Sequence, residues 1–414
     1  LRSPMSWRRR SRSDWGRLGM KSEWKKVPIE SLCIGIYDGP HATPPKSDYG
    51  AVFLGISNFS NGRLDLSNIR YISEDDLPRW TKRVTPKAHD IVFSYEATLN
   101  LYAIIPEGFY GCLGRRMALM RPDESKVDYR FLYYYMYSSQ WREEIERHKV
   151  NGSTVDRIPL VSFPSFTVNL PNMATQKYIA EILSALDEKI ELNNKINEDL
   201  YAQAKALFYK SFINIVTIPE GWEKGNLLDI ANYLNGLAMQ KYRPKENEDG
   251  IPVLKIKELR QGSCDSSSEL CSPNIKPEYI IRDGDVIFSW SGSLLVDIWC
   301  GGTCGLNQHL FKVTSDIYDK WFYYLWTVHH LNRFIAVAAD KATTMGHIKR
   351  EELAKAEVLI PSEEDYKEIS AVMNPIFELI IANRIENRKL AELRDGLLPK
   401  LMSGDIDLTR NEEM

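Results

Sequence analysis

The sequence has no long hydrophobic run and little cysteine. No apolar stretch approaches the ~20 residues that a membrane span requires, so we expect a cytoplasmic protein without a membrane partner. The chain has 414 residues and six cysteines, and their spacing lacks the paired pattern of structural zinc sites. A metal site formed by Cys300, Cys304 and His309 is the alternative. Buried free thiols in a reducing compartment are the expected state, with no bound metal.

Recognisable catalytic motifs are also missing. There is no Gly-Lys-Ser/Thr phosphate loop, and the glycine-rich residues 301–305 lack the Asn/Asp-Pro-Pro-aromatic motif that a DNA methyltransferase would need. Pro122-Asp123 resembles the start of a nuclease carboxylate cluster, but the acid-x-Lys at 124–126 follows too closely for a separate metal-binding strand. No Ser/His/Asp arrangement stands out among seven histidines. We therefore expect no catalytic residue and a non-enzymatic role.

Positive charge is scarce outside the N-terminus. The net charge is −3, but residues 1–19 hold six arginines and one acid, which leaves −8 for the rest. Proteins that bind nucleic acid usually show net or local positive charge, so basic groups must gather on one face or a partner must supply them. Residues 1–19 are interpreted as a disordered basic leader, with a DNA-binding arm as the alternative.

The sequence does contain an internal repeat. Residues 48–56 resemble residues 248–256, residues 90–95 resemble 285–290, and Leu170-Pro171 matches Ile360-Pro361, with separations of 200, 195 and 190. A period near 190 indicates a duplicated domain plus helix, because solenoid repeats are roughly 20–50 residues long. Two such units can form a pseudo-two-fold object, and duplex DNA is a natural two-fold partner.

Each half contains short β-like runs and one aromatic, helix-like segment. The aromatic segments lie at 130–136 and 321–326. Aromatic stripes at helical spacing belong more often to a core than to a base-stacking surface. The fold class predicted is therefore α+β, with two similar β-rich domains. The expected strands are residues 51–56, 90–95, 117–120, 253–256, 285–290 and 310–313.

Each half ends in a long helix with a coiled-coil seam, in which steps of four and three residues alternate. An asparagine in such a seam costs stability but fixes the register. The short connection at 211–221 favours an antiparallel pair with the globular domains at opposite ends. Pro375 predicts a bend or a delayed helix start. The first seam is Ile179, Leu183, Leu186, Ile190, Asn193, Asn197, Leu200, Ala204 and Leu207, and each position recurs 190 residues later, including Asn383 and Asn387.

These features resemble the specificity subunit of type I restriction–modification systems, over about residues 21–408. The resemblance is carried by Trp222 with Leu228-Asp229-Ile230, by the helix at 171–190, and by the closing residues 397–404. Three features depart from the family pattern. The second helix has residues 363–366 where the first has Thr175-Gln176, and it contains Pro375. The residues that open the first domain, 28–32, match the entry motif of the family poorly.

The resemblance implies recognition domains at 20–165 and 218–355 and conserved helices at 171–215 and 361–408. In that family each domain recognises one half of a bipartite site in double-stranded DNA. The coiled coil sets the spacing and docks two methyltransferase subunits, which bring S-adenosylmethionine and methylate adenine. A restriction subunit that uses ATP and Mg²⁺ translocates and cleaves DNA. The resemblance therefore implies that this chain binds no cofactor itself.

Candidate DNA contacts lie in polar loops at matching places of the two halves, with residue 114 matched to Gly305 at a separation of 191. Different residues at matching places are what two different half-sites would require. The alternative for each loop is a solvated turn. The candidates are Lys46, Arg115, Arg116, Ser153 and Thr154 in the first half, and Lys241, Tyr242, Arg243, Asn307, Gln308, His309, Lys341, Thr343, Thr344, His347 and Lys349 in the second.

Two other functions remain open at this point. The duplicated architecture would also suit a protein–protein scaffold of a defence system that does not recognise DNA. It would suit the detached recognition portion of a single-chain restriction enzyme as well. Salt-dependent, sequence-selective DNA binding in the presence of a methyltransferase subunit would distinguish recognition from scaffolding.

Overall fold

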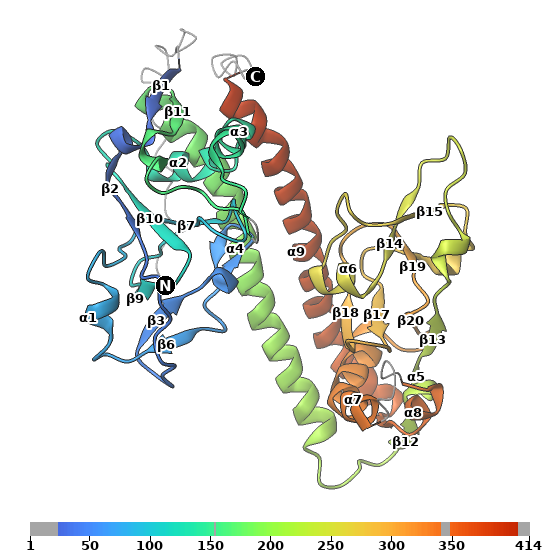
Figure 1. The fold of residues 1–414 in the computed structure, drawn as a ribbon. Coiled ribbons are helices and arrows are strands. Elements are labelled where there is room, and N and C mark those ends of the chain that lie inside the picture. Colours follow the sequence, from blue (N-terminus) through green and yellow to red (C-terminus); the bar gives the residue numbers. More distant parts are fainter. Residues whose placement is uncertain (1–23, 153–154, 341–347, 405–414) are drawn as a thin grey trace, which may run out of the picture. The chain divides into compact units, whose positions relative to one another are not determined.

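The computed structural model describes residues 24–152, 155–340 and 348–404, drawn in colour in Figure 1. The chain divides into two compact units. Unit 1 comprises Leu1–Leu186 and Leu393–Met414, and unit 2 comprises Asp187–Glu392. Each unit therefore contains one of the two sequence repeats and part of each long helix.

Unit 1 is built on two small sheets and a terminal strand pair. A four-stranded sheet has the order β2-β10-β7-β8, a three-stranded sheet has the order β6-β3-β9, and β1 pairs with β11. The strands are β1 (Lys25–Pro28), β2 (Cys33–Asp38), β3 (Ala51–Leu54), β6 (Arg70–Ile72), β7 (Ile91–Ser94), β8 (Tyr102–Ile104), β9 (Gly111–Leu113), β10 (Met117–Pro122) and β11 (Thr167–Leu170), with a hairpin of β4 (Phe59–Ser60) and β5 (Arg63–Leu64). The helices are α1 (Leu77–Trp80), α2 (Tyr129–Tyr135) and α3 (Ser139–His148), with 3-10 turns η2 (Ile29–Leu32), η3 (Ile56–Asn58) and η4 (Phe163–Ser165).

Unit 2 repeats this plan. One sheet has the order β13-β20-β17-β18, a second has the order β15-β14-β19-β16, and β12 pairs with β21. The strands are β12 (Glu223–Asn226), β13 (Asn232–Asn235), β14 (Ile251–Leu254), β15 (Leu270–Cys271), β16 (Ile280–Ile281), β17 (Val286–Ser289), β18 (Leu295–Ile298), β19 (Cys304–Leu306), β20 (Leu310–Thr314) and β21 (Glu357–Ile360). The helices are α5 (Leu227–Ile230), α6 (Ile256–Gln261), α7 (Lys320–Asp340) and α8 (Arg350–Ala354), with 3-10 turns η6 (Met239–Lys241) and η7 (Pro277–Tyr279).

The six expected strands agree with β3, β7, β10, β14, β17 and β20 to within two residues at each end. The strand expected at residues 253–256 is shifted by two residues, because β14 ends at Leu254 and α6 begins at Ile256. The Glu258 carboxylate accepts a hydrogen bond from the Lys255 backbone N–H at 3.2 Å and so closes the first helical turn.

The aromatic segments form helices α2 and α7, and their rings are core residues. Phe131 and Tyr135 in unit 1 are at most 1% exposed, and Trp321 and Phe322 in unit 2 are fully buried. Trp321 also donates its indole N–H to Ser370 on the following long helix, at 3.2 Å. The core interpretation is therefore confirmed, since rings buried in this way cannot stack on bases.

The long helices are α4 (Met173–Phe208), which ends in the π-helical turn η5 (Tyr209–Ile213), and α9 (Glu363–Ser403). Of the two effects expected of Pro375, the delayed start was wrong, because α9 begins at Glu363 and continues through Pro375, and the bend stays a prediction. Ser362 stabilises this early start by accepting a hydrogen bond from the Asp365 N–H at 3.2 Å. Acidic residues in the first turn also complement the helix dipole.

The first turn of each long helix bonds to its own domain in an equivalent way. In unit 1 the Gln176 side chain accepts a hydrogen bond from the Asp128 N–H at 2.9 Å. In unit 2 the Tyr366 hydroxyl accepts one from the Asp319 N–H at 2.6 Å. Gln176 and Tyr366 lie 190 positions apart. The unfamiliar residues at 363–366 therefore preserve a contact that the first helix makes through its glutamine.

Candidate nucleic-acid interface

In unit 1 a three-residue loop, residues 114–116, joins β9 to β10. A Cβ on Gly114 would lie 1.9 Å from the Leu54 carbonyl oxygen, so only glycine fits there. Arg115 is exposed. Arg116 has a positive φ of 69° and its Nε lies 3.0 Å from Glu96 Oε1. The loop thus presents one free-standing guanidinium group and holds the other in an ion pair.

The corresponding loop of unit 2 is residues 307–309, between β19 and β20. Asn307 is 7% exposed, and its side-chain oxygen accepts the His309 N–H at 3.2 Å. His309 Nδ1 lies 3.0 Å from the Ser291 hydroxyl. Gln308 is partly exposed between these two residues. This loop therefore presents polar side chains and no arginine or lysine.

Strand register corrects the alignment of the two loops. Leu113 pairs with Leu54, and Leu306 pairs with Leu254, which lies 200 positions after Leu54. On the other side of each loop, Met117 pairs with Ser94 in unit 1 and Leu310 with Ser289 in unit 2. Both flanks give a separation of 193, so the expected match at 191 was wrong. Arg115 is equivalent to Gln308, and Arg116 is equivalent to His309.

A second loop in each unit meets the first at one aromatic residue. In unit 1 the Tyr95 N–H donates to the Arg116 carbonyl at 3.2 Å, and the Tyr95 carbonyl accepts from the Ile158 N–H at 2.7 Å. In unit 2 the Trp290 N–H donates to His309 at 3.4 Å, and the Trp290 carbonyl accepts from Ile348 at 3.0 Å. Tyr95 and Trp290 follow the equivalent strands β7 and β17. Each unit thus brings the first loop and a residue that follows the second loop, Ile158 in unit 1 and Ile348 in unit 2, to one aromatic residue.

Most residues singled out in these second loops fall outside the described part of the chain. Within the described part, Lys349 is exposed and precedes α8 directly. In unit 1 the chain after the loop is held by backbone bonds between Val150 and Arg157, at 2.9 and 3.1 Å. The candidates outside the described residues are Ser153, Thr154, Lys341, Thr343, Thr344 and His347.

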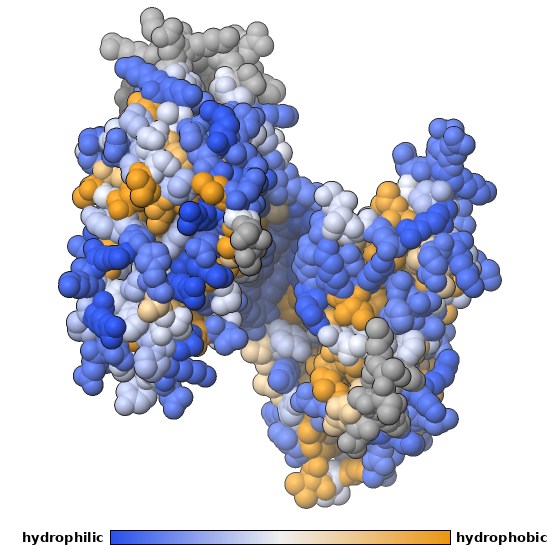
Figure 2. All heavy atoms as spheres, in the orientation of Figure 1, coloured by the Kyte–Doolittle hydropathy of each residue, from blue (hydrophilic) through white to orange (hydrophobic). Residues whose placement is uncertain are grey.

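The remaining candidates lie in the loops that precede β3 and β14. Lys46 is exposed in the loop between β2 and β3. Lys241 is exposed in η6, and Tyr242 is 40% exposed. Arg243 forms an ion pair with Glu269 at 3.0 Å, and this pairing weakens the attraction of Arg243 for a phosphate group of DNA. In Figure 2 hydrophilic residues cover most of the visible surface of unit 2 around β14 and β15.

Three ionisable side chains near Tyr95 were not among the residues predicted from the sequence. The Tyr95 hydroxyl lies 3.4 Å from His41 Nδ1, His41 Nε2 lies 3.0 Å from Asp38, and Asp38 also pairs with Arg83. Burial raises the pKa of Tyr95, and the carboxylates of Glu96 and Asp38 raise it further, whereas Arg83 and Arg115 oppose the rise. No local pattern links positions 38–41, 83 and 95, because only the sheet brings them together.

The four seam asparagines meet in two hydrogen-bonded pairs within unit 2. Asn193 donates its amide to Asn387 at 2.8 Å, and Asn383 donates to Asn197 at 2.9 Å. Asn193 and Asn383 are 190 positions apart, as are Asn197 and Asn387. The second pair is therefore the two-fold image of the first. Since higher positions on α4 pair with lower positions on α9, the helices run antiparallel there.

Neither a metal cluster nor a membrane helix is found in the part of the chain that the structure describes. No group of three or more His, Cys, Asp or Glu side chains gathers there in a way that could hold a metal ion. No described helix combines the length and apolar composition needed to cross a bilayer. The six cysteines are free thiols, and four of them are buried.

Comparison with known proteins identifies the family. The model of the family described as "Type I restriction modification DNA specificity domain" matches residues 21–202 and 219–394. The chain belongs to this family. The two matched segments correspond to the two repeats, each with most of its long helix.

Named relatives resemble the chain along most of its length. The type I restriction enzyme MjaIX specificity subunit of Methanocaldococcus jannaschii is 26% identical over 374 residues, which cover 83% of this chain and 85% of that protein. The HindI specificity subunit of Haemophilus influenzae is 21% identical, covering 93% of this chain and all of that protein. The solved S subunit of a type I restriction–modification system from M. genitalium shares the fold, with a TM-score of 0.56 and 15% identity over 93% of this chain and 97% of that one.

Membership of this DNA specificity family confirms several expectations. The relatives are named as specificity subunits, the non-catalytic class of subunit expected from the sequence. The duplicated α+β architecture is confirmed by the two family matches and by the shared fold. A DNA-specificity role is therefore favoured over the alternative of a scaffold that does not recognise DNA.

Proposed function

We propose that the chain recognises a bipartite site in duplex DNA, with one recognition domain for each half. The observation that carries this proposal is the convergence of two loops on Tyr95 in unit 1 and on Trp290 in unit 2. The backbone hydrogen bonds are the same in both units, whereas the side chains on the loops differ. A shared frame with different exposed side chains is suited to recognising two different half-sites.

The loop side chains suggest which base edges they contact. An arginine donates two parallel hydrogen bonds to guanine O6 and N7, and a glutamine pairs in a bidentate way with adenine N6 and N7. Arg115 is exposed, whereas Arg116 is held by Glu96. Arg115 therefore suits guanine in the first half-site, and the equivalent Gln308 suits adenine in the second. Lys46, Lys241 and Lys349 are exposed cations suited to backbone phosphates.

The paired helices suit a role in spacing and assembly. The symmetric asparagine pairs support one fixed register for the antiparallel helices. In this proposal the coil sets the distance between inverted half-sites and docks two methyltransferase subunits, which carry S-adenosylmethionine. Restriction subunits that use ATP and Mg²⁺ join the same complex in the cytoplasm, and this chain holds no cofactor. The charge of −8 outside residues 1–19 favours partners that supply positive surface.

Exchange of one domain tests the proposal. Residues 222–350 are replaced by the corresponding domain of another family member, and the chain is expressed with its methyltransferase subunits. Methylome sequencing of the host should show a new second half-site with an unchanged first half-site. The wild-type chain, expressed in the same way, is the control. A change in both half-sites, or methylation that follows no bipartite sequence, would refute the proposed division of recognition.

A further inference from the structure

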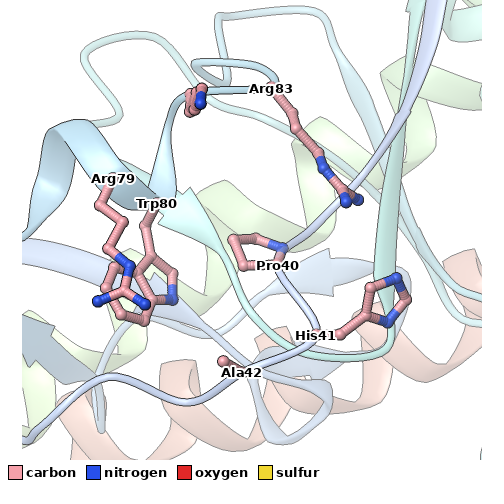
Figure 3. Close-up of a pocket in the computed structure, with 7 residues that line it drawn as sticks. Pro40, His41, Ala42, Arg79, Trp80 and Arg83 are labelled. Carbon is pink, nitrogen blue, oxygen red and sulfur yellow. The ribbon is translucent and has the colours of Figure 1, made fainter.

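Unit 1 has a pocket of about 370 Å³ between the loop after β2 and the C-terminal end of α1 with the residues that follow it. Its walls come from Pro40, His41 and Ala42 on one side and from Arg79, Trp80, Lys82 and Arg83 on the other (Figure 3). Four of these seven residues carry a basic side chain. The expected DNA contacts do not include any of them.

The indole of Trp80 lies in the wall with an unused hydrogen-bond donor. Trp80 is 6% exposed, and its Nε1 has no acceptor within the described protein. Buried donors are nearly always satisfied by protein, water or ligand. In Figure 3 the indole nitrogen lies on the side of the ring toward Pro40 and Ala42. The pocket therefore offers a donor to a molecule that enters it.

Positive charge surrounds this donor and is only partly neutralised. The Arg79 guanidinium carbon lies 5.1 Å from the Trp80 ring centre, and Lys82 is exposed. Neither cation has a carboxylate partner within the described residues. Arg83 pairs with Asp38 but remains 52% exposed. An indole N–H beside two unpaired cations favours a compact anion with several acceptor oxygens.

We propose that this pocket holds a phosphodiester group of the DNA backbone at the first half-site, bound by Trp80 Nε1, Arg79 and Lys82. This inference rests on the proposed function. DNA is favoured as the source of the phosphate because the pocket adjoins the base-contact loop. The Tyr95 hydroxyl lies 3.4 Å from His41 Nδ1 in the pocket wall, and the Tyr95 N–H donates to the Arg116 carbonyl of that loop at 3.2 Å, so a duplex on the loop would bring its backbone near the pocket.

Unit 2 has a different group at the equivalent place. Ile72 pairs with Ala51, and Cys271 pairs with Ile251, which sets the separation there at 199 positions. At that separation Pro78 matches Pro277 at the start of each short helical turn. Glu278 then replaces Arg79, and Tyr279 replaces Trp80. A carboxylate at this position would repel a phosphate, so the anchor belongs to the first half-site alone.

The experiment uses the complex with its methyltransferase subunits and a duplex that carries the methylated site of the host. Binding is measured against salt for wild type, Trp80→Phe, Arg79→Gln with Lys82→Gln, and the matched control Glu278→Gln. The double variant should bind about tenfold more weakly, and its salt slope should fall by about 0.9, the value for one phosphate contact. Trp80→Phe keeps an aromatic ring but removes the indole N–H, and it should lose affinity several-fold. Glu278→Gln should change neither quantity, and the methylated sequence should stay the same, because phosphate contacts carry no base information.

Methylphosphonate substitution locates the contact. Single neutral linkages are placed along the first half-site. Wild type should lose affinity at one linkage, and the double variant should show no further loss there. The phosphate site would be refuted if the methylphosphonate duplexes weakened the double variant as much as they weaken wild type at every linkage. It would also be refuted if the double variant kept the affinity and the salt slope of wild type. Either result would leave the proposed function intact. Failure of the wild-type complex to select its site would instead refute the proposed function. Equal thermal stability of the variants shows that they are folded.

Discussion

The two recognition domains keep the same frame and differ in what the frame presents. The order of the larger sheet in unit 1 and of its counterpart in unit 2 is repeated, as are the backbone bonds at Tyr95 and Trp290, whereas the other sheet of unit 2 has one additional strand, β16. Buried strands tolerate few substitutions, because a change in side-chain volume disturbs the close packing of the core. The loops between them are exposed and can change freely, so Arg115 in one unit has become Gln308 in the other. A repeated frame with divergent loops is the arrangement that the proposed recognition of two different half-sites requires.

The second domain is also tied to its long helix by charge. Arg384 of α9 makes two hydrogen bonds to Asp297, at 2.8 and 2.9 Å, and Arg388 bonds to Asp283 at 2.7 Å. The equivalent positions of α4 are Asn194 and Glu198, neither of which can form an ion pair with a carboxylate. The attachment of helix to domain has therefore diverged along with the loops.

The largest effect is expected from making the first loop like the second. Arg115→Gln with Arg116→His should reduce methylation of the original site about 5- to 150-fold, because the one base contact proposed for this loop contributes about 1–3 kcal/mol of discrimination. The second half-site should stay unchanged. Methylome sequencing together with methylation rates on defined duplexes measures both effects.

Gly114 must be kept in this variant, although Asn307 stands at the equivalent place. A side chain on Gly114 would meet the Leu54 carbonyl, and misfolding would then be mistaken for lost recognition. Lys87→Gln, a change at an exposed cation of the same unit, is the matched control and should leave methylation intact. If the first half-site kept its sequence and its rate in the loop variant, the loop would not recognise bases.

These loops also show what sequence could and could not predict. The β-like runs and the heptad seam follow from local patterns, and both were found. The loop alignment failed because it matched Gly114 to Gly305, two glycines with different roles. Gly305 lies within β19, where a Cβ would come 2.4 Å from Cys271 Sγ. Gly114 is required by the Leu54 carbonyl at the start of the loop. Only strand register separates these two causes.

The Trp80 pocket lay beyond sequence analysis for a different reason. Its walls are two segments about 40 positions apart that carry no shared pattern. A tryptophan beside arginine in a polar stretch is common, and only the buried, unpaired indole nitrogen distinguishes it. The contact between Gln176 and Asp128, repeated by Tyr366 and Asp319, was equally hidden, because a glutamine and a tyrosine have no obvious equivalence.

A smaller effect is expected at the Arg384–Asp297 pair. Both side chains are 28% exposed, so Arg384→Gln leaves a largely buried carboxylate without its partner. The variant should lose about 2 kcal/mol of stability, after allowance for partial exposure. The urea midpoint measured by tryptophan fluorescence reports the loss.

Two further variants make this prediction specific. Adding Asp297→Asn to Arg384→Gln should recover part of the stability, since the unpaired charge is then removed. Lys389→Gln, at an exposed position of the same helix, should change the midpoint little. Equal losses for Arg384→Gln and Lys389→Gln would show that the ion pair does not secure α9 to the second domain.

The smallest effect is expected where the two-fold symmetry of the seam is broken. Asn193→Ala and Asn383→Ala remove equivalent buried amides, and each should cost about 1 kcal/mol. Asn193 should cost more, because it also donates to Glu386 at 2.7 Å and accepts from Lys189 at 2.8 Å. The hydrogen bond from Asn193 and then that from Lys189 lower the pKa of Glu386 below its ordinary 4.5.

A carboxyl group whose pKa is lowered by folding stabilises the protein above its unfolded value, and this stabilisation is lost as the pH falls through the folded value. Asn193→Ala should therefore lose more stability than Asn383→Ala near neutral pH. This difference in stability should shrink as the pH falls below 4.5 and through the lower pKa of Glu386 in the folded protein. Urea midpoints of both variants, measured from about pH 7 to about pH 3.5, test this expectation. Lys195→Ala removes an exposed charge of α4 outside the asparagine pairs, and its urea midpoint relative to wild type should not change over the same pH range. A gap between the two variants that persists at the lowest pH would assign the asymmetry to packing instead of to Glu386.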